Sequence, residues 1–169
     1  MGKFSYPKFY QKISAFYRTR ERAKKTVYYV DKIATALVFL AYLAGFFLLV
    51  IGKTSLFSKR FLTFLLCPFS ALISVSLLRL LIKRKRPYEN GISPLFEKQK
   101  TGNSFPSRHA ASAFSIAFSL FPVNFPCAIV ALFCGITFLY TRTVLGWHYP
   151  SDLSAGGLLG AVFGAICLL

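Results

Sequence analysis

Residues 61–87, FLTFLLCPFSALISVSLLRLLIKRKRP, decide the fold class, because a long apolar run ends there in a cluster of cations. The apolar part, 61–82, matches the roughly 20 residues that a helix needs to cross the hydrocarbon core of a membrane. Pro68 inside the run predicts a kink. Arg79 lies in the last predicted turn, where a permanent charge is costly unless it serves a site. The stretch therefore predicts a membrane helix whose basic end has a function.

The rest of the chain has the composition of a membrane protein. Of its 169 residues, 55% are hydrophobic and 19 are Phe. With 61–82, the other apolar runs predict about five membrane helices, at 33–51, 106–121, 127–140 and 151–169. The expected fold class is therefore all-α, an integral membrane bundle of about five transmembrane helices.

Two of these runs predict close helix packing. Residues 106–121 would span only about 24 Å as a helix, and small residues at their start favour packing against other helices rather than lipid. Four glycines of the last run mark one helix face as a packing surface: Gly156, Gly157, Gly160 and Gly164. That face could pack internally or across a dimer, so the oligomeric state stays open.

The N-terminal segment, 1–31, is basic and aromatic and forms a part of its own before the transmembrane domain, 32–169. Its aromatic and apolar residues include a set at helical spacing: Phe9, Ile13, Phe16 and Tyr17. Cations surround this set, which predicts an amphipathic helix in the membrane interface. The alternative is a disordered basic tail. No obvious signal peptide precedes the first apolar run, which has the length of a spanning helix.

The net charge of +16 has three possible meanings. Cytoplasmic ends of membrane helices carry Lys and Arg, basic segments attract anionic lipid, and cations bind nucleic acid. The high apolar content argues against nucleic acid, so we expect the lipid bilayer and a phosphorylated lipid as partners. The four cysteines lie in apolar runs without a Cys-x-x-Cys pair, and they predict neither disulfides nor a metal or other cofactor.

Three short motifs lie next to the ends of these apolar runs. They are Arg79-x6-Arg86-Pro87, Pro106-Ser107-Arg108-His109 and Arg142-x5-His148-x3-Asp152. The first follows the second predicted helix, the next begins the third, and the last joins the fourth to the fifth. With five alternating crossings, all three motifs reach one face of the membrane, which is also the face of the N-terminus.

The motif residues suit phosphoryl transfer. Ser107 at a helix start, with the free N–H groups there, could cradle a phosphate, and His109 in the first turn could reach a leaving oxygen. Four residues apart on a helix, Asp152 could accept a hydrogen bond from His148 and leave its other ring nitrogen free to attack. Taken alone, each pair is better explained by an ordinary feature. Ser107 and His109 would be the polar tip of a capped helix, and the other pair would be a satisfied histidine or an Asp152 that caps the last helix.

Arginines supply the permanent positive charge that a phosphoryl group needs in the transition state. Arg79, Arg86 and Arg142 have the forked donors that suit phosphate oxygens. Singly, each could be a cation at a helix end or cytoplasmic boundary. Their convergence on one face makes the joint interpretation, a phosphate site, the stronger one.

With these motifs the chain resembles the type 2 phosphatidic acid phosphatase superfamily, which includes bacterial membrane lipid phosphatases and shares its site with vanadium haloperoxidases. The family pattern is Lys-x6-Arg-Pro, Pro-Ser-Gly-His and Ser-Arg-x5-His-x3-Asp, and the match covers residues 79–152. Three positions depart from it. Arg79 replaces Lys, Thr141 replaces Ser, and Arg108 replaces Gly, which adds bulk and a cation at the cradle.

The resemblance implies a phosphoric ester hydrolase that acts in two steps without metal. His148 would form a phosphohistidine, His109 would protonate the leaving alcohol, and Asp152 would orient His148. The phosphate-binding residues it implies, with Arg108 added at the cradle, are Arg79, Arg86, Ser107, Arg108 and Arg142.

Phosphatidylglycerophosphate, phosphatidic acid and a polyprenyl diphosphate all fit as substrates. The alternatives are a vanadate-dependent haloperoxidase-like enzyme and a non-catalytic binder of phosphorylated headgroups.

The distribution of cations predicts the orientation. Nine Lys or Arg precede residue 33, seven lie between 83 and 108, and three lie in the loop at 53–60 on the other side. The positive-inside rule therefore places the N-terminus and the site in the cytoplasm, in a bacterial cell membrane as the resemblance implies. Many bacterial relatives have six spans and a site that faces outward. This chain is expected to lack one early span, so its site need not face outward.

Overall fold

The computed structural model describes residues 6–98 and 100–169, apart from the side chain of Cys167, and it is all-helical over that range. The all-α prediction is therefore confirmed. The helices are α1 (Tyr6–Arg18), α2 (Glu21–Ile51), α3 (Lys59–Ile82), α4 (Arg108–Leu120), α5 (Phe125–Val144) and α6 (Pro150–Ala165), with short 3-10 turns at Pro87–Asn90 and Ile166–Leu168. The first five residues of the predicted N-terminal segment lie outside this range.

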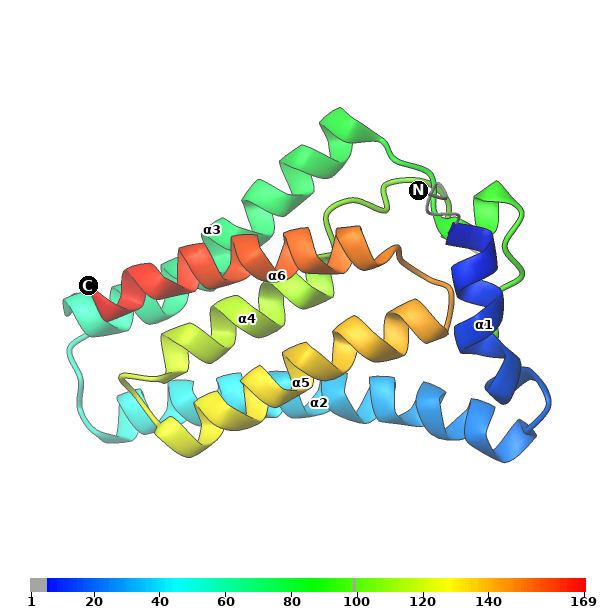
Figure 1. Cartoon of the computed structure of the whole chain (residues 1–169). Helices are drawn as coiled ribbons and strands as arrows, with labels where there is room; N and C mark the ends of the chain where they lie inside the picture. The colour runs from blue at the N-terminus through cyan, green and yellow to red at the C-terminus, as the bar shows by residue number, and fades with distance from the viewer. Residues whose placement is uncertain (1–5, 99) are drawn as a thin grey trace.

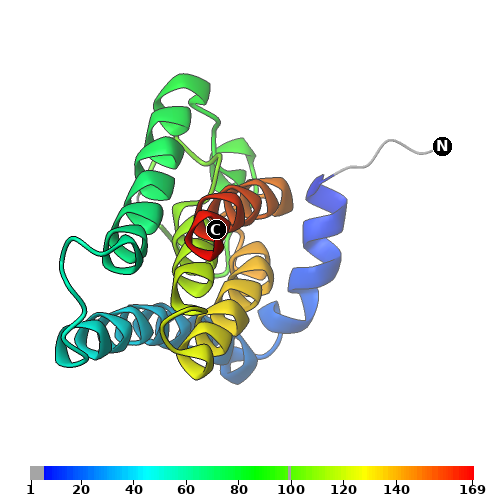
Figure 2. The ribbon, with the colours of Figure 1, turned by 90° about the vertical axis from the view of Figure 1, so that its left-hand side faces the viewer.

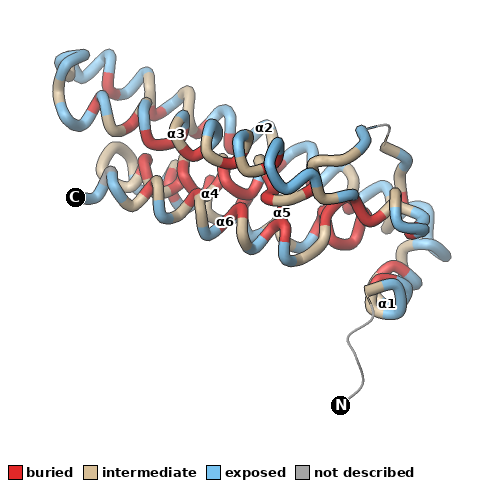
Figure 3. The backbone as a smooth tube through the Cα atoms, turned by 90° about the horizontal axis from the view of Figure 1, so that it is seen from above, coloured by how far each residue is buried: buried red, intermediate tan, exposed pale blue. Residues whose placement is uncertain are grey.

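The long helices run side by side and bring the motif-bearing ends together. In Figure 1 the start of α2, the end of α5 and the start of α6 lie at one end of the bundle, beside α1. The loop that follows α3 runs to the same end. Large hydrophobic side chains of α2, α3 and α5 are exposed on the outside of the bundle, and the buried positions form stripes between the helices (Figure 3).

Three segments are long and apolar enough to cross a membrane: Glu21–Ile51, Lys59–Asn90 and Phe125–Val144. The chain is thus an integral membrane protein. Helices α4 and α6 have 13 and 16 residues, shorter than the roughly 20 that a full crossing needs. The count of five crossings therefore stays a prediction, although the alternating direction of the five helices matches it.

Helix α2 begins about twelve residues earlier than the apolar run predicts. It starts at Glu21 and continues through the basic stretch before Ile33. Charged residues with good helix propensity extend the helix there, and Glu21 favours the positive end of the helix dipole. The helix therefore runs across the boundary expected at residue 31, while the division into two domains remains an expectation.

Helix α4 is the centre of the bundle, and its contact with α6 depends on glycine. A Cβ atom on Gly160 would lie 2.2 Å from the carbonyl oxygen of Ala111, and one on Gly156 would lie 2.3 Å from that of Ser107. Gly164 faces α4 in the same way. The glycine face predicted from the sequence packs internally, because only a hydrogen atom fits at these crossings.

Helix α1 crosses the end of the bundle at which the motif loops lie (Figures 1 and 2). Its Tyr10 is buried against Gly146, whose φ of +75° suits glycine. Its Tyr6 ring packs on Tyr149 at 4.6 Å between centroids. The segment is a helix as expected, but its best-buried residues are Tyr10 and Ser14, while Phe16 is exposed. Its location in the membrane interface stays a prediction.

Candidate active site

Six ionisable side chains are buried at one end of the bundle. Arg79, Arg86, Arg142, Asp31, His148 and Asp152 each expose 5% or less of their surface. They come from α2, α3, α5, α6 and the loops that follow α3 and α5. Burial of this many charged groups is costly unless they compensate one another or serve a site, so this end of the fold is the candidate site.

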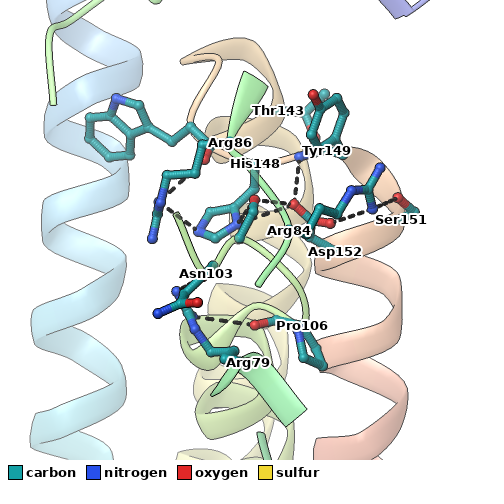
Figure 4. A network of polar contacts seen from close by, with 12 residues as sticks. Arg79, Arg84, Arg86, Asn103, Pro106, Thr143, His148, Tyr149, Ser151 and Asp152 are labelled. Atoms are coloured by element: carbon teal, nitrogen blue, oxygen red, sulfur yellow. Dashed lines mark hydrogen bonds and ion pairs between the residues drawn. The ribbon is translucent and has the colours of Figure 1, made fainter. Parts of the chain in front are cut away.

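His148 lies between a carboxylate and a guanidinium (Figure 4). Its Nδ1 is 3.5 Å from Oδ2 of Asp152 and 3.4 Å from the hydroxyl of Ser104. Its Nε2 is 3.5 Å from Nη1 of Arg86. With Nδ1–H directed to the carboxylate, Nε2 presents a lone pair beside a cation that could hold phosphate oxygens.

The pKa of His148 is lowered to about 4, chiefly because burial disfavours the imidazolium ion. The hydrogen bond and charge of Asp152 oppose this effect, and the cations Arg86 and Arg142 add to it. The imidazole is therefore neutral at pH 7, which is the form that can act as a nucleophile.

Asp152 is fixed by three donors besides His148. Its Oδ2 accepts from the Ser104 hydroxyl and from the Tyr149 backbone N–H at 3.1 Å, and its Oδ1 lies 2.7 Å from Nη1 of Arg84. The Arg84 guanidinium also stacks on the Tyr149 ring. The carboxylate therefore cannot rotate freely, and it holds the orientation of His148.

Arg86 is held by the loop around it. Its Nε donates to the carbonyl of Gly102 at 3.1 Å, and Nη1 lies 3.4 Å from the carbonyl of Trp147. Glu89 accepts from the backbone N–H groups of Arg86 and Gly102, at 2.7 and 2.8 Å. These contacts tie the two ends of the loop together and set the Arg86 guanidinium beside His148.

Arg142 pairs with an acidic residue that the motifs do not include. Its Nε lies 2.8 Å from Oδ1 of Asp31, and its Nη2 donates to Oδ2 at 3.0 Å. Thr141 donates to the same carboxylate at 3.1 Å. The remaining Nη1 of Arg142 is buried without a partner among the described residues, so it is free to bind an anion.

The start of α4 holds the residues of Pro106-Ser107-Arg108-His109, whose role as a phosphate cradle stays a prediction. The backbone N–H of Ser107 donates to the Asp152 carbonyl at 2.8 Å, which ties α4 to α6. The Ser107 hydroxyl is buried without a partner in the described part of the chain, as a phosphate-binding group would be. The first N–H groups of the helix, at Arg108, His109 and Ala110, add donors that the helix itself cannot use.

Arg79 is placed differently from the other arginines. Its guanidinium donates to the carbonyls of Asn103 and of Pro106, the latter at 3.3 Å, and so braces the loop that leads into α4 (Figure 4). The charges of Arg108, Arg86 and Asp152 act on Arg79, so its guanidinium lies near the same site. Its predicted contact with phosphate stays a prediction.

His109 and Arg108 line an apolar cavity of about 340 Å³. The His109 ring packs edge-on against Phe138, with 6.1 Å between centroids. The cavity continues along α4 between α2 and α3, where a second cavity of about 410 Å³ shares Leu72, Ser112 and Ile116 with it. Figure 2 shows the ribbons of α2 and α3 apart on this side, with α4 next to both.

The sequence motifs missed several residues of the site. Asp31 is a lone carboxylate at the start of an apolar run, and that isolation was the signal that could have identified it. Ser104 and Arg84 lie inside the motif loop without a distinctive pattern.

Lys98 is a further cation of that loop and lies over the Trp147 ring, 3.9 Å from its centroid. Burial, Arg142 and Arg86 lower the pKa of Lys98 to about 7. It therefore exchanges its proton near neutral pH.

The described residues hold no group of three or more side chains of the kind that binds a metal ion. Cys67, Cys127 and Cys134 are free thiols, and the side chain of Cys167 lies outside the described part. The expectation of a metal-free reaction remains a prediction.

Two curated proteins that are similar to part of this chain are both named as phosphatases. A lipid A 4'-phosphatase of Bacteroides thetaiotaomicron is 39% identical over 98 residues, which are 53% of this chain and 43% of that protein. A decaprenylphosphoryl-5-phosphoribose phosphatase of Mycobacterium tuberculosis is 34% identical over 91 residues, 53% of this chain and 49% of that one. The chain thus spans less than half the length of these relatives.

The fold has a close counterpart among solved structures. The crystal structure of Aquifex aeolicus LpxE superimposes with a TM-score of 0.67 and 22% identity, over 98% of this chain and 96% of that one. The sequence pattern of the PAP2 superfamily matches residues 60–169, which include all three motifs. The chain therefore belongs to the PAP2 superfamily.

Proposed function

We propose that the protein is a membrane lipid phosphatase that hydrolyses a phosphomonoester or diphosphate headgroup through a phosphohistidine, without a metal ion. One observation carries the proposal. A buried, neutral His148 has Nδ1 directed to Asp152 and Nε2 3.5 Å from the Arg86 guanidinium. A nucleophile, the group that orients it and a cation for the phosphate oxygens thus lie in one place.

In the first step the lone pair of His148 Nε2 forms a bond to phosphorus. The bond between phosphorus and the leaving oxygen breaks, and that oxygen keeps the electron pair. His109 supplies a proton to the leaving oxygen when it belongs to an alcohol. Asp152 stabilises the positive charge that develops on the His148 ring during the attack.

In the second step water attacks the phosphorus of the phosphohistidine. His109, now neutral, accepts a proton from the water, and the bond between phosphorus and Nε2 breaks with its electron pair returning to His148. Inorganic phosphate leaves, and both histidines recover their starting protonation.

The phosphate oxygens gain charge as the reaction proceeds, and fixed donors would stabilise them. The available donors are the Arg86 guanidinium, the unpartnered Nη1 of Arg142, the Ser107 hydroxyl and the first N–H groups of α4. Arg79 donates a hydrogen bond to the carbonyl of Pro106 and so supports the loop that leads into α4. Preorganised donors of this kind cost no rearrangement when charge develops.

A lipid substrate is supported by the surroundings of His109. The apolar cavity beside it provides a place for hydrocarbon, and its walls come from α4 and from three helices long enough to cross a membrane, α2, α3 and α5. Two relatives are named as phosphatases, one of lipid A and one of a decaprenyl compound. The shared feature is a phosphate on a membrane lipid.

The full-length protein is expected to release phosphate from a panel of phosphatidic acid, phosphatidylglycerophosphate and a polyprenyl diphosphate. Vanadate should inhibit well below the concentration at which phosphate does, because it adopts the five-coordinate geometry of the transition state. A chelator should leave the rate unchanged. Loss of activity in chelator, restored by magnesium, would contradict the metal-free mechanism, and binding of the lipids without phosphate release would indicate a non-catalytic protein.

The site is proposed to face the cytoplasm, because its end of the bundle carries most of the cations. In a background without native cysteines, a cysteine at the exposed Lys85 should react with an impermeant maleimide only after cells are opened. A cysteine at Lys53, in the exposed loop at the opposite end of the bundle, is the matched control and should react in intact cells. The reverse pattern would place the site outside.

A further inference from the structure

A small basic pocket lies next to the phosphate site, at the junction of α3, α4 and the loop between them. Its volume is about 160 Å³, several times the roughly 30 Å³ that one water occupies in the liquid. Three cations line it, Arg79, Lys100 and Arg108, and its other polar walls come from Ser76, Thr101 and Asn103. No described carboxylate is among the lining residues.

The positive charge of this pocket is not neutralised by the protein. Among the described residues, no ion pair joins Lys100 or Arg108 to a carboxylate, and the two buried acidic residues at this end of the bundle are engaged elsewhere. Asp152 holds His148 and Arg84, and Asp31 holds Arg142. In the described part of the chain, the hydrogen bonds of the Arg79 guanidinium go to neutral carbonyls of the loop.

The cations of the pocket are close enough to repel one another. The charge of Arg108, with smaller effects of burial, Arg79 and Arg86, lowers the pKa of Lys100. Like charges that gather around a cavity favour the entry of an anion, which relieves the repulsion. The pocket therefore has the properties of an anion site, and neither histidine is among its lining residues.

Arg108 connects this pocket to the leaving-group side of the reaction. The same residue lines both the basic pocket and the apolar cavity that contains His109. In the proposed mechanism His109 protonates the leaving oxygen, so a group attached to that oxygen would lie next to Arg108. Lys100 and Arg79 also line the basic pocket.

We propose that this pocket binds a second phosphoryl group, which the lipid substrate carries on the leaving side of the bond that is broken. The inference rests on the proposed phosphatase function and narrows its substrates. A polyprenyl diphosphate and phosphatidylglycerophosphate both carry such a group, and phosphatidic acid does not. For a diphosphate, the oxygen that leaves with the electron pair belongs to a lipid monophosphate, whose charge stays in the pocket.

The test compares two matched pairs of substrates with the full-length protein in detergent micelles. Farnesyl diphosphate is compared with farnesyl monophosphate, and phosphatidylglycerophosphate with phosphatidic acid of the same acyl chains. The wild type should hydrolyse the doubly phosphorylated member with a kcat/KM about tenfold higher or more, the effect of one charge-assisted hydrogen bond. The ratio of kcat/KM within each pair is then compared. A larger ratio for the farnesyl pair means that the second phosphoryl group is joined directly to the one that is cleaved, and a larger ratio for the other pair means that glycerol separates the two groups.

Arg108→Gln should lower kcat/KM for the two doubly phosphorylated lipids by about tenfold more than for farnesyl monophosphate and phosphatidic acid, mainly through a higher KM. Arg108→Lys should restore most of the difference, which shows that charge and not folding is responsible. Lys85→Gln removes an exposed cation from the same loop outside the pocket, and its substrate ratios should equal those of the wild type.

Two results would overturn the inference while the phosphatase function stands. One is a wild type that shows no preference within either pair, and the other is an Arg108→Gln variant that loses the same factor on all four lipids. A wild type that releases phosphate from none of the four lipids would instead refute the phosphatase function itself.

Discussion

Replacing His148 with alanine is expected to lower phosphate release by at least about 10⁴-fold, because no other described side chain offers a neutral nitrogen next to Arg86 and Asp152. The measurement is the single-turnover rate with a labelled lipid, combined with acid-free trapping of the phosphoenzyme. The wild type should retain label on the protein, and the variant should retain none. Both proteins should give the same helical content by circular dichroism.

His109→Ala serves as the matched control for this experiment, since it removes the other histidine of the chain. It should also slow turnover, but a substrate with a good leaving group should still label the protein at His148. If the His148→Ala protein retained label, or if its turnover were close to that of the wild type, the nucleophile would be a different group.

Replacing Asp31 with alanine is expected to lower the free energy of unfolding by about 3–5 kcal/mol, because it leaves the guanidinium of Arg142 buried without its counter-charge. It should also lower kcat, since Arg142 is no longer held with its free Nη1 toward the site. The measurements are denaturant unfolding in detergent and phosphate release below the unfolding range.

The double variant Asp31→Ala/Arg142→Ala separates the two effects. Removal of both partners abolishes the unpaired buried charge, so stability should recover toward that of the wild type. Activity should stay low, because the Arg142 guanidinium that is proposed to bind phosphate is absent. Recovery of activity together with stability would mean that Asp31 and Arg142 are structural only.

Much of the fold and site follows from local sequence, for physical reasons that particular residues illustrate. Apolar runs of membrane length predict α2 and α3, because hydrocarbon admits only backbone that satisfies its own hydrogen bonds. The run that predicts α5, 127–140, is shorter than the helix, which spans Phe125–Val144. Alternation of the crossings places Arg86, His148 and Asp152 at one end of the bundle. The glycine spacing of α6 predicts a close crossing, which the structure places against α4.

The rest depends on contacts between distant segments. Asp31 is 111 residues from Arg142 in the sequence, and nothing local to either residue identifies the pair. The start of α2 at Glu21 depends on helix propensity rather than on hydropathy. Arg79 satisfies the motif pattern, yet its guanidinium bonds to the carbonyls of Asn103 and Pro106, which only the folded loop brings to it.

The cavity beside His109 lies along the gap between α2 and α3, on the side of the bundle where exposed apolar residues such as Phe39 and Leu72 would meet lipid. If the protein hydrolyses membrane lipids as proposed, its substrate would reach this cavity by two-dimensional diffusion within one leaflet. Its velocity then follows the mole fraction of the lipid in the bilayer rather than the total amount in the vessel. Dilution with inert lipid would slow such a catalyst even when the quantity of substrate stays constant.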